Sequence, residues 1–300
     1  MFINFEKDNK NRNLGLKKHK CKVCMAEGEF QSYLPREMMR GTKEEFEYFV
    51  CSSCGCLQIA KIPDDMGQYY GETYYSFQPQ EKEDYIYETP VTNEMKILDV
   101  GCGSGEWLFL LAQKGYSNLW GCDPFLPKES MRFGERVYIK KCSIHEIVEY
   151  ESFDMIHMED SFEHMSDPFE VLQSASRLLK PTGILTMTIP FFPNVAFELF
   201  ETHWYQLDAP RHFFLHSKQS IEYLAKKAGL MIWEINYNSN ESQYIRSLLY
   251  QNGMAFCEQK PEILARIFTQ EQVQEFKQMA EINNQHEYGD HVEIKLFRDL

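Results

Sequence analysis

The stretch from Met95 to Phe125 constrains the fold more than any other part of the chain. An apolar run, Ile97 to Val100, enters a turn with glycines at 101, 103 and 105, and apolar residues at helical spacing follow. This pattern predicts a strand, a tight turn and a helix. A second short strand is predicted from Asn118 to Cys122 and ends in Asp123. An acid about 20 residues after such a turn accepts hydrogen bonds from ribose hydroxyls in nucleotide-binding βαβ units, so the stretch predicts a site for a nucleoside cofactor.

The residue after the turn argues against a dinucleotide as the cofactor. The dinucleotide fingerprint has its third glycine where this chain has Glu106, whose carboxylate would repel a pyrophosphate. The order Asp99, Gly101, Gly103, Gly105, followed by Asp123, resembles the first motif of class I S-adenosylmethionine-dependent methyltransferases. The resemblance implies an α/β fold with a Rossmann-like, seven-stranded sheet. It also implies that the glycines approach the amino acid end of the cofactor, that Asp99 orients its ammonium group and that Asp123 holds its ribose. A glycine turn in an unrelated α/β protein is the alternative.

Composition narrows the class of protein. With 300 residues, 43% of them hydrophobic, the chain is long enough for one large domain and a small one. It has no run of 18 apolar residues, and residues 1–20 are polar and lysine-rich, so we expect a cytoplasmic protein without a membrane segment. A formal net charge of −14 argues against binding a long phosphate backbone, although Lys7 to Lys20 could form a local basic patch.

Four cysteines have the spacing of a metal site. Cys21 and Cys24 form one Cys-x-x-Cys pair, and Cys51 and Cys54 form another after 26 intervening residues. Each pair can present two thiolates to one tetrahedral ion, and four thiolates leave no position for a substrate, so a structural zinc ribbon is predicted. Cys56 is interpreted as a buried thiol, with an alternative role as a ligand.

A tyrosine-rich segment precedes the glycine turn. Paired tyrosines at 69 and 70 and at 74 and 75 lead into a charged linker. Such aromatic density can simply fill the space between two domains. The functional alternative is a lid in which Tyr74 and Tyr75 contact the cofactor or the acceptor.

The third strand departs from the family pattern. We expect at most a short helix from Pro127 to Arg136 and a strand from Val137 to Lys141. Class I methyltransferases usually have an acid after this strand that holds the adenine amino group, and this chain has Cys142, Ser143 and Ile144. Ser143 or a backbone carbonyl is the expected substitute.

The fourth strand carries the candidate catalytic residues. Phe153 to Asp160 is predicted to be a strand, and Glu163 and His164 follow before a helix that starts at Asp167-Pro168. This arrangement resembles the fourth-strand motif of small-molecule methyltransferases. Ligands bind at the carboxyl ends of parallel strands, which favours a functional role for Asp160, Glu163 and His164. His164 is the first candidate for a general base because imidazole titrates near neutrality. The alternative is a surface Glu163 and a core-edge His164.

A long aromatic loop, residues 191–216, follows the fifth strand, Ile184 to Ile189. Its segment from Trp204 to His212 resembles a methyltransferase subgroup, often with an N-terminal zinc ribbon, that is associated with sugar and surface-polysaccharide biosynthesis. The resemblance implies that Trp204 and Arg211 contact the acceptor and that His212 is a second candidate base. Alternatively, Arg211 forms only an ion pair with Asp208 that fixes the loop.

The remaining chain completes the expected fold. We expect a helix from Ser217 to Ala228, a sixth strand from Met231 to Tyr237, a helical insertion over 241–286 and an antiparallel final strand, Val292 to Phe297, at the sheet edge. The predicted organisation is a tail and zinc ribbon over 1–66, a linker or lid over 67–93, a cofactor-binding core over 94–240, and the insertion with the last strand over 241–300.

These features together predict an S-adenosylmethionine-dependent methyltransferase with structural zinc. Its expected acceptor is a small molecule, a sugar or nucleotide-sugar intermediate. Two alternatives stay open. One is an RNA methyltransferase that uses the ribbon to bind RNA. The other is a non-catalytic protein, which is favoured only if Asp160, Glu163 and His164 are exposed and distant from the cofactor.

Overall fold

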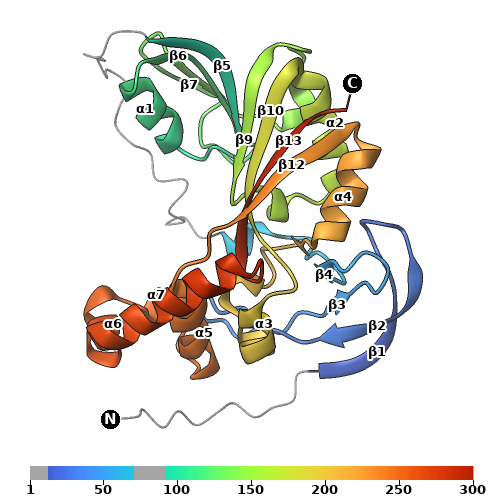
Figure 1. The fold of residues 1–300 in the computed structure, drawn as a ribbon, viewed down its shortest axis with the longest axis vertical. Helices are drawn as coiled ribbons and strands as arrows, with labels where there is room; N and C mark the ends of the chain where they lie inside the picture. Colours follow the sequence, from blue (N-terminus) through green and yellow to red (C-terminus); the bar gives the residue numbers. More distant parts are fainter. Residues whose placement is uncertain (1–12, 71–91, 300) are drawn as a thin grey trace. The chain divides into compact units, whose positions relative to one another are not determined.

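The computed structural model describes residues 13–70 and 92–299, so the predicted contacts of Tyr74 and Tyr75 lie outside the described residues. The described chain divides into two compact units (Figure 1). The first comprises residues 13–69, 190–221 and 236–293, and the second comprises residues 70, 92–189, 222–235 and 294–299.

The second unit contains an eight-stranded sheet in the order β12-β13-β10-β9-β5-β6-β8-β7. Its strands are β5 (Asn93–Val100), β6 (Tyr116–Cys122), β7 (Ser130–Phe133), β8 (Val137–Lys140), β9 (Phe153–Glu159), β10 (Leu179–Pro190), β12 (Leu230–Tyr237) and β13 (His291–Arg298). The pairings from β10 through β9, β5 and β6 to β8 are parallel. This mostly parallel sheet confirms the predicted α/β methyltransferase fold.

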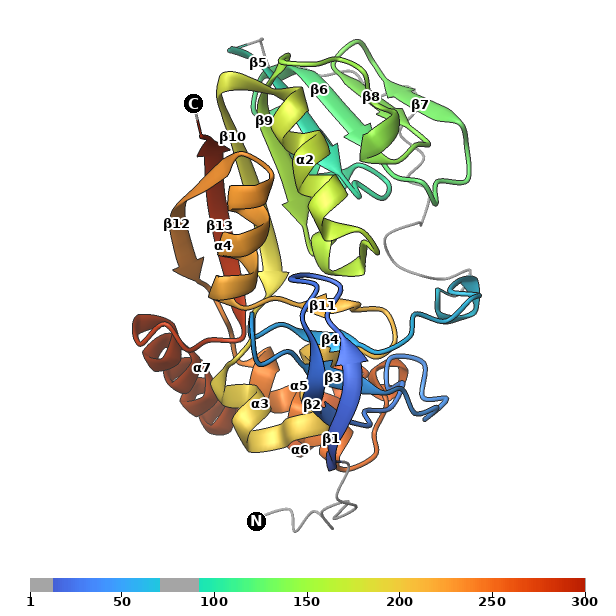
Figure 2. The same cartoon turned by 90° about the vertical axis from the view of Figure 1, so that its right-hand side faces the viewer.

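Two details of the sheet differ from the prediction. Residues 127–136, expected to be a short helix at best, contain strand β7, which pairs antiparallel with β8. Gly134, with φ of 58°, lies in the turn between them, and Phe133 is buried against Phe109, so the hairpin fills the core. Strand β13 lies between β12 and β10 instead of at the edge and runs opposite to both (Figure 2). Its Val292, Ile294 and Leu296 are fully buried, as an interior strand requires.

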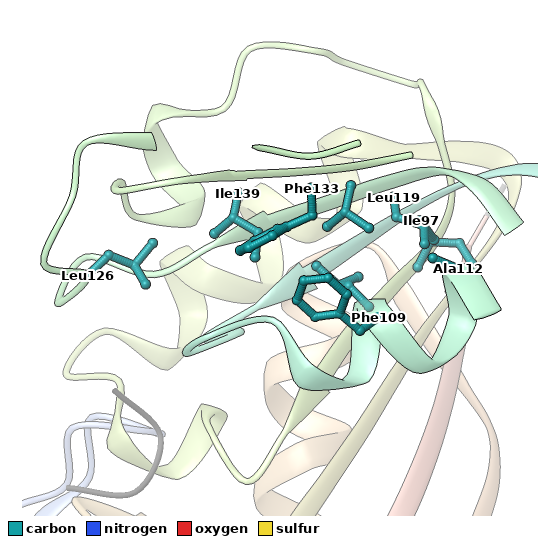
Figure 3. Packing of buried hydrophobic residues seen from close by; sticks show 9 residues of the cluster. Ile97, Phe109, Ala112, Leu119, Leu126, Phe133 and Ile139 are labelled. Carbon is teal, nitrogen blue, oxygen red and sulfur yellow. The ribbon is translucent and has the colours of Figure 1, made fainter. Parts of the chain in front are cut away.

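Helices cover the sheet of the second unit. Helix α1 (Glu106–Gln113) packs on the face opposite to α2 (Pro168–Leu178) and α4 (Lys218–Lys227) (Figures 1 and 2). Figure 3 shows how α1 closes its face: Phe109 and Ala112 pack against Ile97, Leu119 and Ile139 from three adjacent strands. Short 3-10 helices lie at η3 (Ile144–Glu146) and η4 (Phe162–His164). This packing fixes the helix that begins directly after the glycine turn.

The first unit contains a five-stranded sheet in the order β1-β2-β3-β4-β11. The strands are β1 (Asn13–Lys20), β2 (Glu27–Tyr33), β3 (Tyr48–Val50), β4 (Leu57–Ile59) and β11 (Phe214–Leu215). The first four come from the predicted zinc ribbon, and β11 comes from the aromatic loop after β10. Phe214 pairs with Gln58 and Leu215 with Leu57 in antiparallel register.

The predicted helical insertion is confirmed in the first unit. It contains α5 (Ser242–Gln251), α6 (Pro261–Ile267) and α7 (Gln270–Gln285), together with η7 (Phe256–Glu258). Thr269 caps α7 by accepting a hydrogen bond from the Gln272 amide at 3.2 Å. The remaining helices of this unit are α3 (Val195–Phe200), η1 (Gly67–Tyr69), η5 (Glu201–His203) and η6 (Tyr205–Leu207). Within residues 13–70 and 92–299, no helix has the length and apolar character needed to cross a membrane.

Candidate active site and metal centre

The glycine turn of the second unit has backbone dihedral angles that residues with a Cβ rarely adopt. Gly101, Gly103 and Gly105 all have positive φ, at 78°, 50° and 83°. A Cβ on Gly101 would lie 2.6 Å from the Ser161 Cβ, and one on Gly105 would lie 2.2 Å from Cδ1 of Ile139. Glycine is therefore required both for the left-handed conformation and for close packing.

Asp123 is held against this turn. Its Oδ2 accepts a hydrogen bond from the Gly103 amide at 3.1 Å, and its Oδ1 accepts one from the Phe125 amide at 2.8 Å. The residue is only 5% exposed, and burial raises the pKa of its carboxyl group. Because a carboxylate oxygen can accept more than one hydrogen bond, Asp123 retains capacity for the hydroxyls of a ribose.

Asp99 lies near the end of β5, two residues before Gly101. It is 4% exposed, and burial raises the pKa of its carboxyl group to about 7, against the opposing effect of His157 on the neighbouring strand. A carboxyl group with such a pKa in a buried site is typical of functional positions.

The end of β9 lies beside the glycine turn. Asp160 has a φ of 43°, and its amide donates to the Thr188 carbonyl. Ser161 is buried, and its Oγ donates to the Val100 carbonyl at 2.9 Å, which ties the two strand ends together. Ser161 was not predicted as a site residue, although a small residue immediately after a strand-end acid was a usable signal. A left-handed aspartate at a strand end is strained, as residues at binding sites often are.

His164 is part of an aromatic group in the second unit. Its Nδ1 lies 3.3 Å from the Tyr70 hydroxyl, and the Tyr70 ring stacks on Phe125 at a centroid distance of 6.0 Å. Phe125 follows Asp123 by two residues and is 65% exposed. Glu163 is fully buried and His164 is half-buried, whereas Asp160 is exposed, so the three residues do not all lie at the surface. Tyr70 thus connects the first candidate base to the segment that carries Asp123.

Ser143 stands where the family usually has an acid. Its hydroxyl donates to the Glu146 carboxylate at 3.0 Å, as does its amide at 2.8 Å, in a capping box at the start of η3. Cys142, one residue earlier, is buried, and a hydrogen bond with Cys122 lowers the pKa of its thiol. The side chain of Ser143 thus has a local partner, while its predicted adenine contact stays a prediction.

The four predicted metal ligands come together in the first unit. Ligand atoms of Cys21, Cys24, Cys51 and Cys54 all lie within 4.8 Å of one another. The two pairs sit in matching turns: the Met25 amide donates to the Cys21 carbonyl, and the Gly55 amide donates to the Cys51 carbonyl. Four converging thiols in two such turns fit a closed, tetrahedral zinc site.

Further contacts support this site. Gln58, fully buried on β4, donates from Nε2 to the Cys21 sulfur at 3.1 Å, and the Cys24 amide donates to the same sulfur at 3.4 Å. Donors onto a ligating sulfur stabilise the thiolate form. Cys56 is buried but is not part of the four-cysteine cluster, in agreement with its interpretation as a buried thiol.

The ribbon is bonded to the aromatic loop within the first unit. The hydroxyl of buried Tyr48 donates to the His212 carbonyl at 2.8 Å, and the Ser217 hydroxyl donates to the Cys54 carbonyl at 2.5 Å. A Cβ on Gly55 would lie 2.9 Å from the Ser217 oxygen, so the contact requires glycine. These bonds flank the β4–β11 pairing, and the four-cysteine module therefore anchors the loop.

Arg211 and Trp204 are engaged by internal partners in the first unit. Arg211 is fully buried, and its guanidinium pairs with both oxygens of Asp208 and with Glu37 at 3.1 Å. This contact corresponds to the alternative in which Arg211 forms an ion pair with Asp208. The indole of buried Trp204 donates to Asp290 at 2.9 Å. His212, the second candidate base, is 7% exposed and its Nδ1 lies 2.6 Å from the Gln206 carbonyl. His212 belongs to the first unit, and His164 belongs to the second.

Comparison with known proteins identifies the class. The family described as a methyltransferase domain matches residues 74–235, more than half of the chain. The chain belongs to this family, and the fold and glycine turn of the second unit are those of a class I methyltransferase domain.

Individual relatives match different shares of this chain. A tRNA U34 carboxymethyltransferase of Idiomarina loihiensis is 30% identical over 102 residues, covering 31% of this chain and 32% of that protein. The mitochondrial ubiquinone biosynthesis O-methyltransferase of Homo sapiens is 36% identical over 107 residues, covering 31% and 28%. Phosphoethanolamine N-methyltransferase 1 of Zea mays is 28% identical over 244 residues, covering 76% and 42%. The chain therefore spans well under half of the length of these relatives.

Two solved structures also match this chain, at lower identity. A complex between the Haloferax volcanii Trm112 methyltransferase activator and a methyltransferase matches with a TM-score of 0.48 and 17% identity, covering 71% of this chain and 86% of that chain. A geranyl diphosphate methyltransferase matches with a TM-score of 0.47 and 15% identity, covering 70% and 80%.

Proposed function

We propose that this protein transfers the methyl group of S-adenosylmethionine to a small-molecule acceptor, a sugar or nucleotide-sugar intermediate. The observation that supports S-adenosylmethionine as the cofactor is the turn of three left-handed glycines, in which the Gly103 amide donates a hydrogen bond to Asp123. A left-handed glycine turn beside a buried acid suits a nucleoside with an amino acid end. Its relatives include proteins named as O- and N-methyltransferases, which agrees with the proposed reaction.

The proposed roles follow from position. When bound, S-adenosylmethionine supplies a methyl group that is electrophilic because it is attached to a sulfonium. Asp123 binds the ribose hydroxyls, Asp99 binds the ammonium group, and Asp160 and Ser143 are proposed to complete the cofactor site. His164, aided by Glu163, accepts a proton from the acceptor, with His212 as the second candidate. In-line transfer requires reacting atoms about 3 to 3.5 Å apart, so positioning carries much of the catalysis.

The charge distribution supports a compact acceptor over RNA. Lysines on β1 lie beside carboxylates: Lys17 is 3.2 Å from Glu47, and Lys20 is 2.8 Å from Glu27. Such pairing reduces the positive charge that would attract a phosphate backbone. In addition, β4 of the ribbon is paired with β11, so the ribbon supports the aromatic loop. RNA remains the second candidate because one relative is named for tRNA.

The test uses zinc-replete protein, methyl-labelled S-adenosylmethionine and a cell extract. Label in a small, phosphatase-sensitive fraction supports a nucleotide-sugar or similar acceptor. Label released only by RNase overturns that acceptor and assigns the ribbon to RNA binding. Without any transferred label and without cofactor binding, the proposed activity itself is wrong.

The base is tested separately with His164→Ala. We expect turnover to fall while cofactor binding persists, and the loss should depend on pH. His286→Ala is the matched control, because this exposed histidine lies at the end of α7 in the first unit. Unchanged turnover of His164→Ala at every pH would remove His164 from the mechanism.

A further inference from the structure

Three polar side chains form a row across adjacent strands of the second unit. Asp99 on β5 is in register with His157 on β9, and His157 is in register with Thr186 on β10. Residues in register on neighbouring strands project from the same face, and such strands are about 4.8 Å apart. His157 is 7% exposed and stands next to the carboxyl group proposed to bind the cofactor's ammonium group.

The imidazole ring of His157 is fixed on two sides. Its Nδ1 lies 2.8 Å from the Thr186 hydroxyl. Its ring stacks on Trp107, in the first turn of α1, with a centroid distance of 4.1 Å and an interplanar angle of 26°. Because α1 starts at the glycine turn, this stacking couples His157 to the cofactor site as well as to the sheet.

His157 opposes the other effects of the surroundings on the ionisation of Asp99. Burial disfavours the carboxylate, and the neighbouring acids Glu159 and Asp123 disfavour it further. The thiols of Cys102 and Cys122 also face this region. Of the described groups that act on Asp99, His157 is the one that favours its ionised form. An opposite charge within about 4 to 6 Å typically lowers the pKa of a carboxyl group by 1 to 3 units.

We propose that His157 is a positioning residue of the cofactor site, which keeps Asp99 anionic so that it binds the ammonium group of the cofactor. The inference rests on the proposed function, since Asp99 receives its role there. Nε2 of His157 lies 3.8 Å from the Glu159 carboxylate on the same strand. Positive charge on the His157 ring favours the carboxylate of Asp99.

The test measures the affinity for S-adenosylhomocysteine by calorimetry as a function of pH. In the unmodified protein, affinity should fall as the pH is lowered and Asp99 is protonated. His157→Phe preserves a ring that can stack on Trp107 but removes the charge. The fall should then begin at higher pH, with about tenfold weaker binding near pH 6 for a shift of one pKa unit, and the two proteins should converge as the pH rises.

Controls separate this role from a structural one. Thr188→Val removes a hydroxyl two residues after Thr186 that has no hydrogen-bond partner in the described structure, and its pH profile should be unchanged. His157→Gln should shift the profile in the same direction as His157→Phe. Loss of affinity by the same factor at every pH, or an unshifted profile, would overturn the inference. If the unmodified protein fails to bind S-adenosylhomocysteine at any pH, the proposed function fails first.

Discussion

Gly105→Ala tests the packing of the glycine turn most directly. Gly105 has a φ of 83° at the N-cap of α1, and a Cβ there would lie 2.2 Å from Cδ1 of fully buried Ile139. The left-handed backbone costs a residue with a Cβ about 1 to 2 kcal/mol. Displacing the Ile139 terminal methyl from its rotamer adds about 1 kcal/mol. We therefore expect Gly105→Ala to lower the free energy of unfolding by about 2 to 3 kcal/mol.

A double-mutant cycle with Ile139→Val separates the two costs. Valine lacks Cδ1, so the steric contact disappears while the backbone cost remains. Ile139→Val alone should cost about 1 kcal/mol. The double variant should then be about 1 kcal/mol more stable than the sum of the single effects predicts. Urea unfolding followed by circular dichroism gives all three values.

Additivity of the two substitutions would refute this reasoning. It would mean that Ile139 does not limit the space at Gly105 and that glycine is retained only for its backbone conformation. A Gly105→Ala variant as stable as the unmodified protein would contradict both parts, including the left-handed turn itself.

Atomic spectrometry should find about one zinc ion per chain, and removal of the zinc by a chelator should lower the unfolding temperature. Full stability without the metal would exclude a structural zinc site. Arg211→Met should destabilise the protein by about 3 to 5 kcal/mol in urea unfolding, because it leaves Asp208 and Glu37 without their cation. A near-neutral effect would show that the ion pair is dispensable. Asp160→Gly should raise the unfolding free energy by about 1 kcal/mol, because glycine adopts the left-handed backbone without strain. The same substitution should weaken the affinity for the cofactor, and unchanged affinity would remove Asp160 from the site.

Local patterns predicted the elements around the cofactor motif. Periodicity and the glycine spacing predicted β5, the turn and α1, because strand, turn and helix signals are contained in a few consecutive residues. The paired cysteines likewise predicted a metal site, since each pair needs only one turn. The hairpin of β7 was missed because its formation depends on pairing with β8 and on Phe133 entering the core, and neither is visible in residues 127–136 alone.

Side-chain roles in the aromatic loop were less predictable. Arg211 has the chemistry of an anion-binding residue in the sequence. Its fully buried pairing with Glu37, 174 residues away, depends on how distant segments meet. His157 had no motif to mark it, since its relation to Asp99 arises only from strand register.

The sequence by itself determined the class of the protein, because the glycine turn, the acid after the second strand and the two cysteine pairs each act within a short stretch of chain. Tertiary structure decided that β11 joins the ribbon sheet and that Tyr48 and Ser217 tie the ribbon to the aromatic loop. It also decided that His157 stands between Asp99 and Thr186. The physical reason is that pairing and burial involve groups far apart in the chain, whose energies depend on positions that only the folded backbone provides.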